Sequence, residues 1–97
     1  MALFKKTEPT TVVDEKIKLR IYAMRDKLSG YQPAIPFVND EVAIRYFKTQ
    51  CLENPTIKNQ PGDFEFYYIG EYDTARATFL QPEHNELIAK GENYVSN

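Results

Sequence analysis

The sequence feature that most constrains the fold is a strict alternation of side chains from Lys16 to Met24. Successive side chains of a β-strand point to opposite faces of a sheet, so this alternation predicts a strand. The set expected to face the core is apolar and consists of Ile17, Leu19, Ile21 and Ala23. The opposite set consists of Lys16, Lys18, Arg20, Tyr22 and Met24. The fold of this chain is therefore expected to contain a β-sheet.

A second strand is predicted over the aromatic run at residues 64–72, which follows a turn at residues 60–63. Alternation divides its side chains between two faces. One face receives Phe64, Phe66, Tyr68 and Tyr72, and the other receives Glu65, Tyr67, Ile69 and Glu71. The chain holds seven Tyr and six Phe, which is more rings than one buried sheet face needs. Some of these rings are therefore expected on a second surface.

The main helix is predicted to begin after Asn39 and to run to about Glu53. Asparagine is a favoured N-cap, and Asp40 and Glu41 suit the positive end of the helix dipole. The apolar stripe of this helix consists of Ala43, Ile44, Phe47 and Cys51. Asn54-Pro55 is expected to end the helix, because proline disfavours the helical conformation of the residue before it.

The C-terminal part is predicted to hold a hairpin and a second helix. Residues 73–76 have the composition of a hairpin loop, and residues 77–80 predict the returning strand. Pro82 suits a first helical position and Gly91 a helix stop, so a short helix is predicted at residues 84–90.

These elements predict an α+β fold in the order β-α-β-β-α. The main helix covers one face of a three- or four-stranded sheet, and half of a ferredoxin-like fold is the nearest architecture. A chain of 97 residues has room for one core, so residues 15–97 are expected to form a single domain. Residues 1–14 are expected to form a flexible arm. Because a short sheet with apolar residues on both faces is readily completed by a symmetric partner, a homodimer is expected.

The composition excludes several classes of site. With only Cys51 and His84, the chain has neither an intramolecular disulfide nor a classical zinc site. The carboxylates of Glu65, Glu71 and Asp73 are too widely spaced along a strand to enclose a metal ion. No glycine-rich phosphate loop occurs, and no apolar run is long enough to cross a membrane. We therefore expect a protein without catalytic residues, metal or cofactor, that is not an enzyme and lies in the cytoplasm.

Charge is distributed unevenly along the chain. Residues 1–31 carry seven basic and four acidic side chains, a net charge of +3, and residues 32–97 carry five basic and ten acidic ones, a net charge of −5. If the basic face of the first strand and the Tyr67 face lie on the same uncovered side, rings stand beside cations. Single-stranded nucleic acids use that combination, because bases stack on rings while cations bind phosphates. The candidate nucleic-acid-binding residues are Lys16, Lys18, Arg20, Tyr22 and Tyr67.

Two other interpretations of this basic and aromatic sheet face remain open. In the first, a second subunit, the N-terminal arm or the C-terminal segment covers the face. In the second, its charged side chains simply face water.

Several residue blocks occur in an order found in a phage family. They are Ile17-Lys18-Leu19-Arg20-Ile21-Tyr22-Ala23-Met24-Arg25-Asp26, Pro36-Phe37, Asn39-Asp40-Glu41-Val42-Ala43-Ile44-Arg45-Tyr46-Phe47, Glu53-Asn54-Pro55, and Asp63-Phe64-Glu65-Phe66-Tyr67-Tyr68-Ile69-Gly70-Glu71-Tyr72-Asp73. The last block is the most specific. From Lys16 onward the chain resembles the small non-structural protein of gokushoviruses and related Microviridae, which are phages with small single-stranded DNA genomes. The arm is longer than in that family, and the glycine that usually follows the position of Asp73 is missing.

The resemblance implies a non-virion protein that is made in the host cytoplasm and serves viral single-stranded DNA synthesis or DNA binding. It supplies no binding residues of its own. One hypothesis is therefore a non-enzymatic phage protein that binds single-stranded DNA and assists genome synthesis or packaging. The alternative is a dimeric protein-interaction module that recruits a viral or host replication or assembly factor without binding DNA itself.

Overall fold

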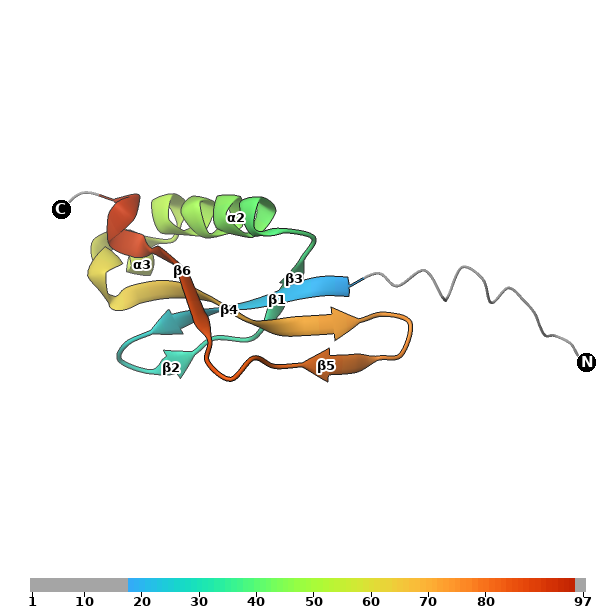
Figure 1. Ribbon diagram of the computed structural model, residues 1–97. Helices are drawn as coiled ribbons and strands as arrows, with labels where there is room; N and C mark the ends of the chain where they lie inside the picture. Colours follow the sequence, from blue (N-terminus) through green and yellow to red (C-terminus); the bar gives the residue numbers. More distant parts are fainter. Residues whose placement is uncertain (1–17, 96–97) are drawn as a thin grey trace, which may run out of the picture.

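Two long neighbouring strands form the centre of the structure, a computed structural model that describes residues 18–95 (Figure 1). Strand β1 (Lys18–Asp26) pairs antiparallel with β4 (Phe64–Asp73) along its whole length. Four shorter strands extend the sheet to six: β2 (Gly30–Tyr31) and β3 (Ile35–Phe37) pair with β1, and β5 (Thr78–Leu80) and β6 (Glu86–Lys90) pair with β4. All of these pairings are antiparallel.

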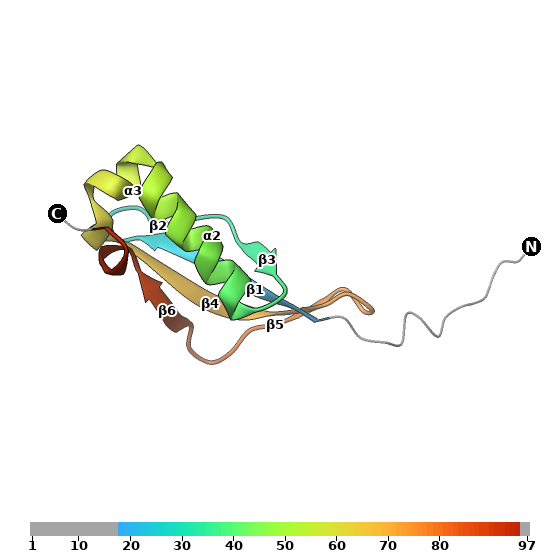
Figure 2. The same ribbon diagram turned by 90° about the horizontal axis from the view of Figure 1, so that it is seen from above.

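Helix α2 (Asp40–Glu53) lies over one face of the sheet (Figures 1 and 2). The backbone N–H of Val42 donates to the side chain of Asn39 at 2.8 Å, which confirms the predicted N-cap. Asn54 ends α2 and also caps the short helix α3 (Pro55–Asn59). Two 3-10 turns complete the described elements: η2 (Pro61–Asp63) precedes β4, and η3 (Gly91–Asn93) follows β6. The signals that start and stop α2 are local, and the sequence predicts them correctly.

The core lies between α2 and the sheet. Its centre is a stack of three rings, in which Phe66 of β4 lies between Phe47 of α2 and Tyr22 of β1. The ring centroids are 4.9 Å apart for Phe47 and Phe66 and 5.5 Å apart for Phe66 and Tyr22, and the planes are nearly parallel. The other buried members of the core are Ala43, Cys51, Ile57, Phe64 and Ala89. This layer of rings attaches the helix to both central strands.

The predicted orientation of β1 is wrong. Tyr22 is fully buried beneath α2 and Met24 packs against the same core, whereas the sequence predicts that Ile17, Leu19, Ile21 and Ala23 face it. Ala23 is also buried, but on the other face of the sheet. The alternation divides the strand into two faces correctly, and it does not tell which face the helix covers when both faces carry apolar side chains. Ile17 lies outside the described residues.

Helix α2 connects two strands that lie on either side of β1. Strands β3 and β4 both run antiparallel to β1, so they run in the same direction with β1 between them. Figure 2 shows α2 crossing above the sheet between these strands. The hairpin of β4 and β5 extends beyond the N-terminal end of α2. Among residues 18–95, this part of the sheet therefore has no helix above it.

The α+β class and the single main helix are confirmed, but the predicted helix at residues 84–90 is wrong. Residues Glu86–Lys90 form strand β6, which pairs with β4, and the sheet has six strands rather than three or four. A register shift lets both Ile88 and Ala89 contact the core. Strand pairing with β4 thus overrides the local signals of Pro82 and Gly91. The half-ferredoxin architecture stays a prediction, and the arm at residues 1–14 lies outside the described residues.

A bulge in β4 creates a position that only glycine fits. The pairing with β1 passes from Gly70 to Tyr68, which leaves Ile69 as the extra residue. A Cβ atom on Gly70 would lie 2.5 Å from the Phe79 ring and 2.7 Å from the carbonyl oxygen of Leu80. We expect Gly70→Ala to lower the free energy of unfolding by about 1–3 kcal/mol, because the strands must move apart. Urea unfolding measures this loss.

Gly62→Ala is the matched control for this substitution. A Cβ atom on Gly62 would meet only the Glu92 side chain, at 3.9 Å. Its effect should stay within about 0.5 kcal/mol. Equal losses in the two variants would contradict the close approach of β5 to Gly70.

Candidate functional site

The residues predicted to bind nucleic acid do not form one surface. Tyr22 is buried in the core, so its ring is not open to a base. Lys18 and Arg20 lie on the helix side of the sheet, where Lys18 is 3.9 Å from Glu71 and Arg20 is 2.9 Å from Asp40. Tyr67 lies on the opposite face, since it alternates with core residues of β4. Lys16 lies outside the described residues. The prediction of a shared uncovered face for these residues is therefore wrong.

Arg20, Tyr22 and Asp40 instead join the sheet to the start of α2. The Arg20 guanidinium Nε donates to the Tyr22 hydroxyl at 3.0 Å and to the Asp40 carboxylate at 2.9 Å, and the Tyr22 hydroxyl donates to the same carboxylate. The guanidinium also lies 4.0 Å from the centre of the Tyr68 ring. Burial, and next the hydrogen bond to Asp40, raise the pKa of Tyr22 to about 12. These contacts fix the helix in place and leave Arg20 engaged within the domain.

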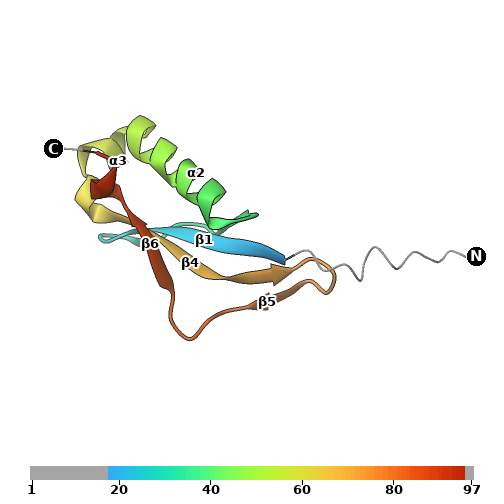
Figure 3. The same ribbon diagram turned by 45° about the horizontal axis from the view of Figure 1, so that its top comes forward.

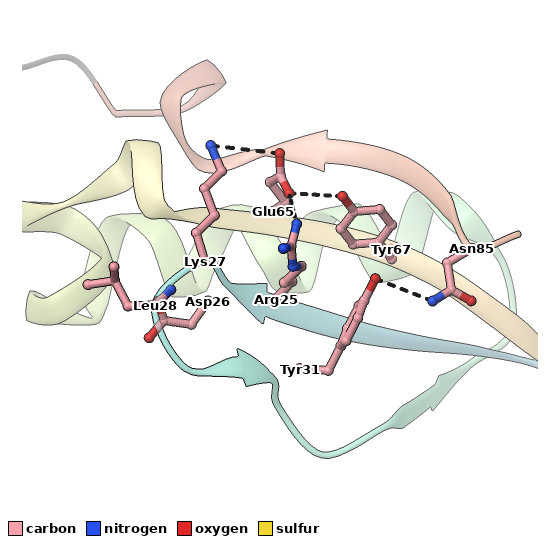
Figure 4. A network of polar contacts seen from close by, with 8 residues as sticks. All are labelled: Arg25, Asp26, Lys27, Leu28, Tyr31, Glu65, Tyr67 and Asn85. Atoms are coloured by element: carbon pink, nitrogen blue, oxygen red, sulfur yellow. Dashed lines mark hydrogen bonds and ion pairs between the residues drawn. The ribbon is translucent and has the colours of Figure 1, made fainter.

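A different set of polar and aromatic side chains gathers on the sheet face that points away from α2 (Figure 4). Its members come from β1, β2, β4 and the segments that follow β1 and precede β6. We call it the open-face cluster, and it consists of Arg25, Lys27, Tyr31, Glu65, Tyr67 and Asn85. Segments that are far apart in the sequence therefore meet at one surface.

Glu65 is the electrostatic centre of the open-face cluster. Its carboxylate accepts a hydrogen bond from the Tyr67 hydroxyl at 2.9 Å, and the Arg25 guanidinium lies at 3.4 Å and the Lys27 ammonium at 3.9 Å. Lys90 stands opposite Glu65 in the pairing of β4 with β6, so it shares this face. Because the Glu65 side chain is only 13% exposed and its cations are 41% and 46% exposed, the charges that reach solvent are mainly positive.

The two tyrosines of the open-face cluster form an aromatic pair. Their ring centroids are 5.5 Å apart, and the Tyr31 ring stands edge-on to the Tyr67 ring at 68°. The Asn85 amide donates to the Tyr31 hydroxyl at 3.3 Å, and Figure 4 shows the Tyr31 side chain pointing toward Asn85. Burial, and next the hydrogen bond to Glu65, raise the pKa of Tyr67, so its hydroxyl stays protonated near neutral pH. Tyr31 is 49% exposed and offers a ring to solvent.

Of this cluster, the sequence predicts only Tyr67 as a binding residue. A signal for Arg25 and Lys27 was present, because both continue the alternation that begins at Leu19 and Ile21. No local pattern marks Tyr31 or Asn85, which reach the site through the turn after β1 and the connection between β5 and β6. Figure 3 shows that connection below the sheet, away from α2.

The described residues, 18–95, hold no group of three or more His, Cys, Asp or Glu side chains that could bind a metal ion. Cys51 is buried, and burial raises the pKa of its thiol to about 11, so it stays protonated and unreactive near neutral pH. His84 is exposed and lies 3.9 Å from Glu83. In the same part of the chain, no helix is long and apolar enough to cross a membrane.

Comparison with known proteins gives one family. The family model described as Phage ORF5 protein matches residues 19–94, a range that contains the open-face cluster and nearly every described strand and helix. A search of curated proteins found no match, and neither did a search of solved structures.

Proposed function

Because this chain belongs to the Phage ORF5 protein family, we propose that it is a non-structural protein of phages related to gokushoviruses that binds single-stranded DNA. The proposed role is non-enzymatic assistance to viral genome synthesis or packaging in the host cytoplasm. The open-face cluster is the proposed binding surface. It replaces the surface of Lys16, Lys18, Arg20 and Tyr22, and it retains Tyr67.

One observation carries this proposal: a tyrosine pair with one exposed ring, Tyr31, stands beside cations on the sheet face that no helix of residues 18–95 covers. The Tyr31 ring, held by Asn85 and Tyr67, gives a base a fixed surface for stacking. Arg25 and Lys27 extend from the adjacent strand end and reach a phosphate backbone that passes the rings. Glu65 holds these two side chains near the rings, and it neutralises only part of their charge.

Fluorescence anisotropy with a labelled single-stranded oligonucleotide tests the proposal. We expect binding that weakens steeply as salt rises, because phosphate contacts release counterions. Tyr31→Ala should weaken binding about tenfold through lost stacking. Lys27→Glu should weaken it by a similar factor at low salt and make the salt dependence shallower.

Lys48→Glu is the matched control, because it makes the same change of charge at an exposed position of α2. It should bind nearly as well as the unchanged protein. Absence of binding at low salt would overturn the proposal. Equal losses for Lys48→Glu and Lys27→Glu would show that net charge, and not the open-face cluster, governs binding.

The second candidate function, a dimeric protein-interaction module, is favoured by apolar side chains near β5 and β6. Phe79, Leu80 and Leu87 are 48%, 70% and 40% exposed. Burial of such side chains favours association with a second copy, or with a viral or host replication protein. Light scattering after size-exclusion chromatography should then give twice the chain mass of 11.3 kDa, and Leu80→Asp should return it to the monomer value. A monomer at all concentrations would exclude the homodimer.

A further inference from the structure

A cavity of about 460 Å³ lies on the helix side of the sheet, away from the open-face cluster. Met24 and Phe64 line it from β1 and β4, and Tyr46 and Gln50 line it from α2. Gln32, in the segment between β2 and β3, lines another part of its wall. Its volume falls within the range of about 300–1,000 Å³ that is typical of small-molecule sites. The cavity is thus large enough for a ligand rather than a few water molecules.

The hydrogen-bonding groups of this cavity fall into two kinds. The carboxylate of Asp26 accepts from the Leu28 N–H and the Ser29 hydroxyl, so its oxygens serve the turn after β1. By contrast, the side-chain amides of Gln32 and Gln50 make no hydrogen bond to any other residue between 18 and 95. Each amide offers both a donor and an acceptor. The cavity therefore presents hydrogen-bond donors and acceptors that no residue between 18 and 95 engages.

The charge of the lining selects against anionic ligands. Of the residues between 18 and 95, no Lys, Arg or His lines the cavity, and Asp26 adds a carboxylate. Among these lining residues a phosphate group would meet no cation, and a metal ion would meet only one carboxylate. Next to the polar groups, Met24, Ile57 and Phe64 supply an apolar wall. An uncharged, flat molecule with donors and acceptors on its edge meets all of these conditions.

We propose that this cavity binds a nucleobase, an inference that rests on the proposed single-stranded DNA binding. Glutamine amides pair with the edges of bases, and apolar and aromatic side chains pack against their faces. The cavity and the open-face cluster use the same strand ends: Asp26 lines the cavity, and the next residue, Lys27, belongs to the cluster. A DNA strand that passes the turn after β1 places a phosphate near Lys27 and an unstacked base in the cavity.

A titration of the full chain, labelled for nuclear magnetic resonance, with 2′-deoxyadenosine tests this proposal. We expect saturable shifts of the side-chain amide signals of Gln32 and Gln50, with the same affinity at low and high salt because the nucleoside carries no charge. Gln50→Leu should weaken binding about tenfold, because one partner of the base is lost. Gln81→Leu, at an exposed position outside the cavity, is the matched control and should leave the affinity unchanged.

Gln32→Leu gives a second variant in case Gln50→Leu disturbs α2, and it should weaken the nucleoside affinity by a similar factor. Lys27→Glu separates the two proposals, because it should reduce oligonucleotide binding and leave nucleoside binding intact. Nucleoside binding without oligonucleotide binding would support the cavity and overturn the proposed function. Absence of shifts with the nucleoside, or equal shifts with deoxyribose alone, would overturn the cavity proposal whatever the oligonucleotide does.

Discussion

Replacement of Phe66 by alanine should lower the free energy of unfolding by about 3–5 kcal/mol, because it removes the middle ring of the stack that joins α2 to the sheet. Phe66 is completely buried, and its neighbours Phe47 and Tyr22 come from the helix and from the other central strand. Neither neighbour can fill the space without leaving its own strand or helix. Since small domains are stable by only about 5–15 kcal/mol, this variant should be close to unfolding at ambient temperature.

The control for this variant is Phe79→Ala, which removes the same side chain from a half-exposed position on β5. Its cost should be about 1 kcal/mol or less. Thermal and urea unfolding, followed by circular dichroism, compare the two variants. Similar losses would mean that the ring stack contributes no more than an exposed phenylalanine, which would contradict the packing described above.

Raising the pH through the range from 10 to 12 should cost about 2–3 kcal/mol of stability through Tyr22 alone. The folded protein holds the hydroxyl proton more tightly than the unfolded chain, because the ring is buried and donates to Asp40. The stabilisation is therefore complete below pH 10, the ordinary pKa of tyrosine, and is lost as the pH rises to about 12. Urea unfolding at a series of alkaline pH values measures this loss.

Tyr22→Phe isolates this contribution from other groups that titrate at high pH, including Tyr67. The phenylalanine keeps the ring stack and removes the ionisable hydroxyl. The difference in stability between the two proteins should be constant below pH 10 and shrink above it. A difference that does not change with pH would mean that Tyr22 ionises as easily in the folded protein as in the unfolded chain.

The parts of the fold that depend on local signals were predictable from the sequence. Helix α2 begins after Asn39 and ends at Glu53, because its cap, its acidic first turn and Asn54-Pro55 act within a few residues. The aromatic strand β4 was also found, and the alternation of its first five residues places Tyr67 correctly on a second face. Beyond that point, the bulge at Ile69 changes which residues share a face, and no local pattern announces it.

The parts that depend on distant partners were not predictable in the same way. Residues 86–90 form a strand because β4 offers an unpaired edge, although Pro82 and Gly91 favour a helix locally. Tyr22 faces inward because its hydroxyl meets Arg20 and Asp40, and Asp40 lies on another element. The candidate site also depends on contacts between distant parts of the chain, because Tyr31 and Asn85 meet only once both edges of the sheet are in place.

The position of β1 between β3 and β4 also sets the order in which the chain can fold. Lys18 pairs with Asp73 and Asp26 pairs with Phe64, so each contact in the central ladder closes a loop of more than a third of the chain. Such long loops slow folding, because their entropy is lost before the pairing compensates for it. During synthesis, β1 leaves the ribosome before β4, and until then its partners among the described strands are the short strands β2 and β3. The nascent chain therefore passes through a stage in which its first long strand exposes one edge, and it completes its core late.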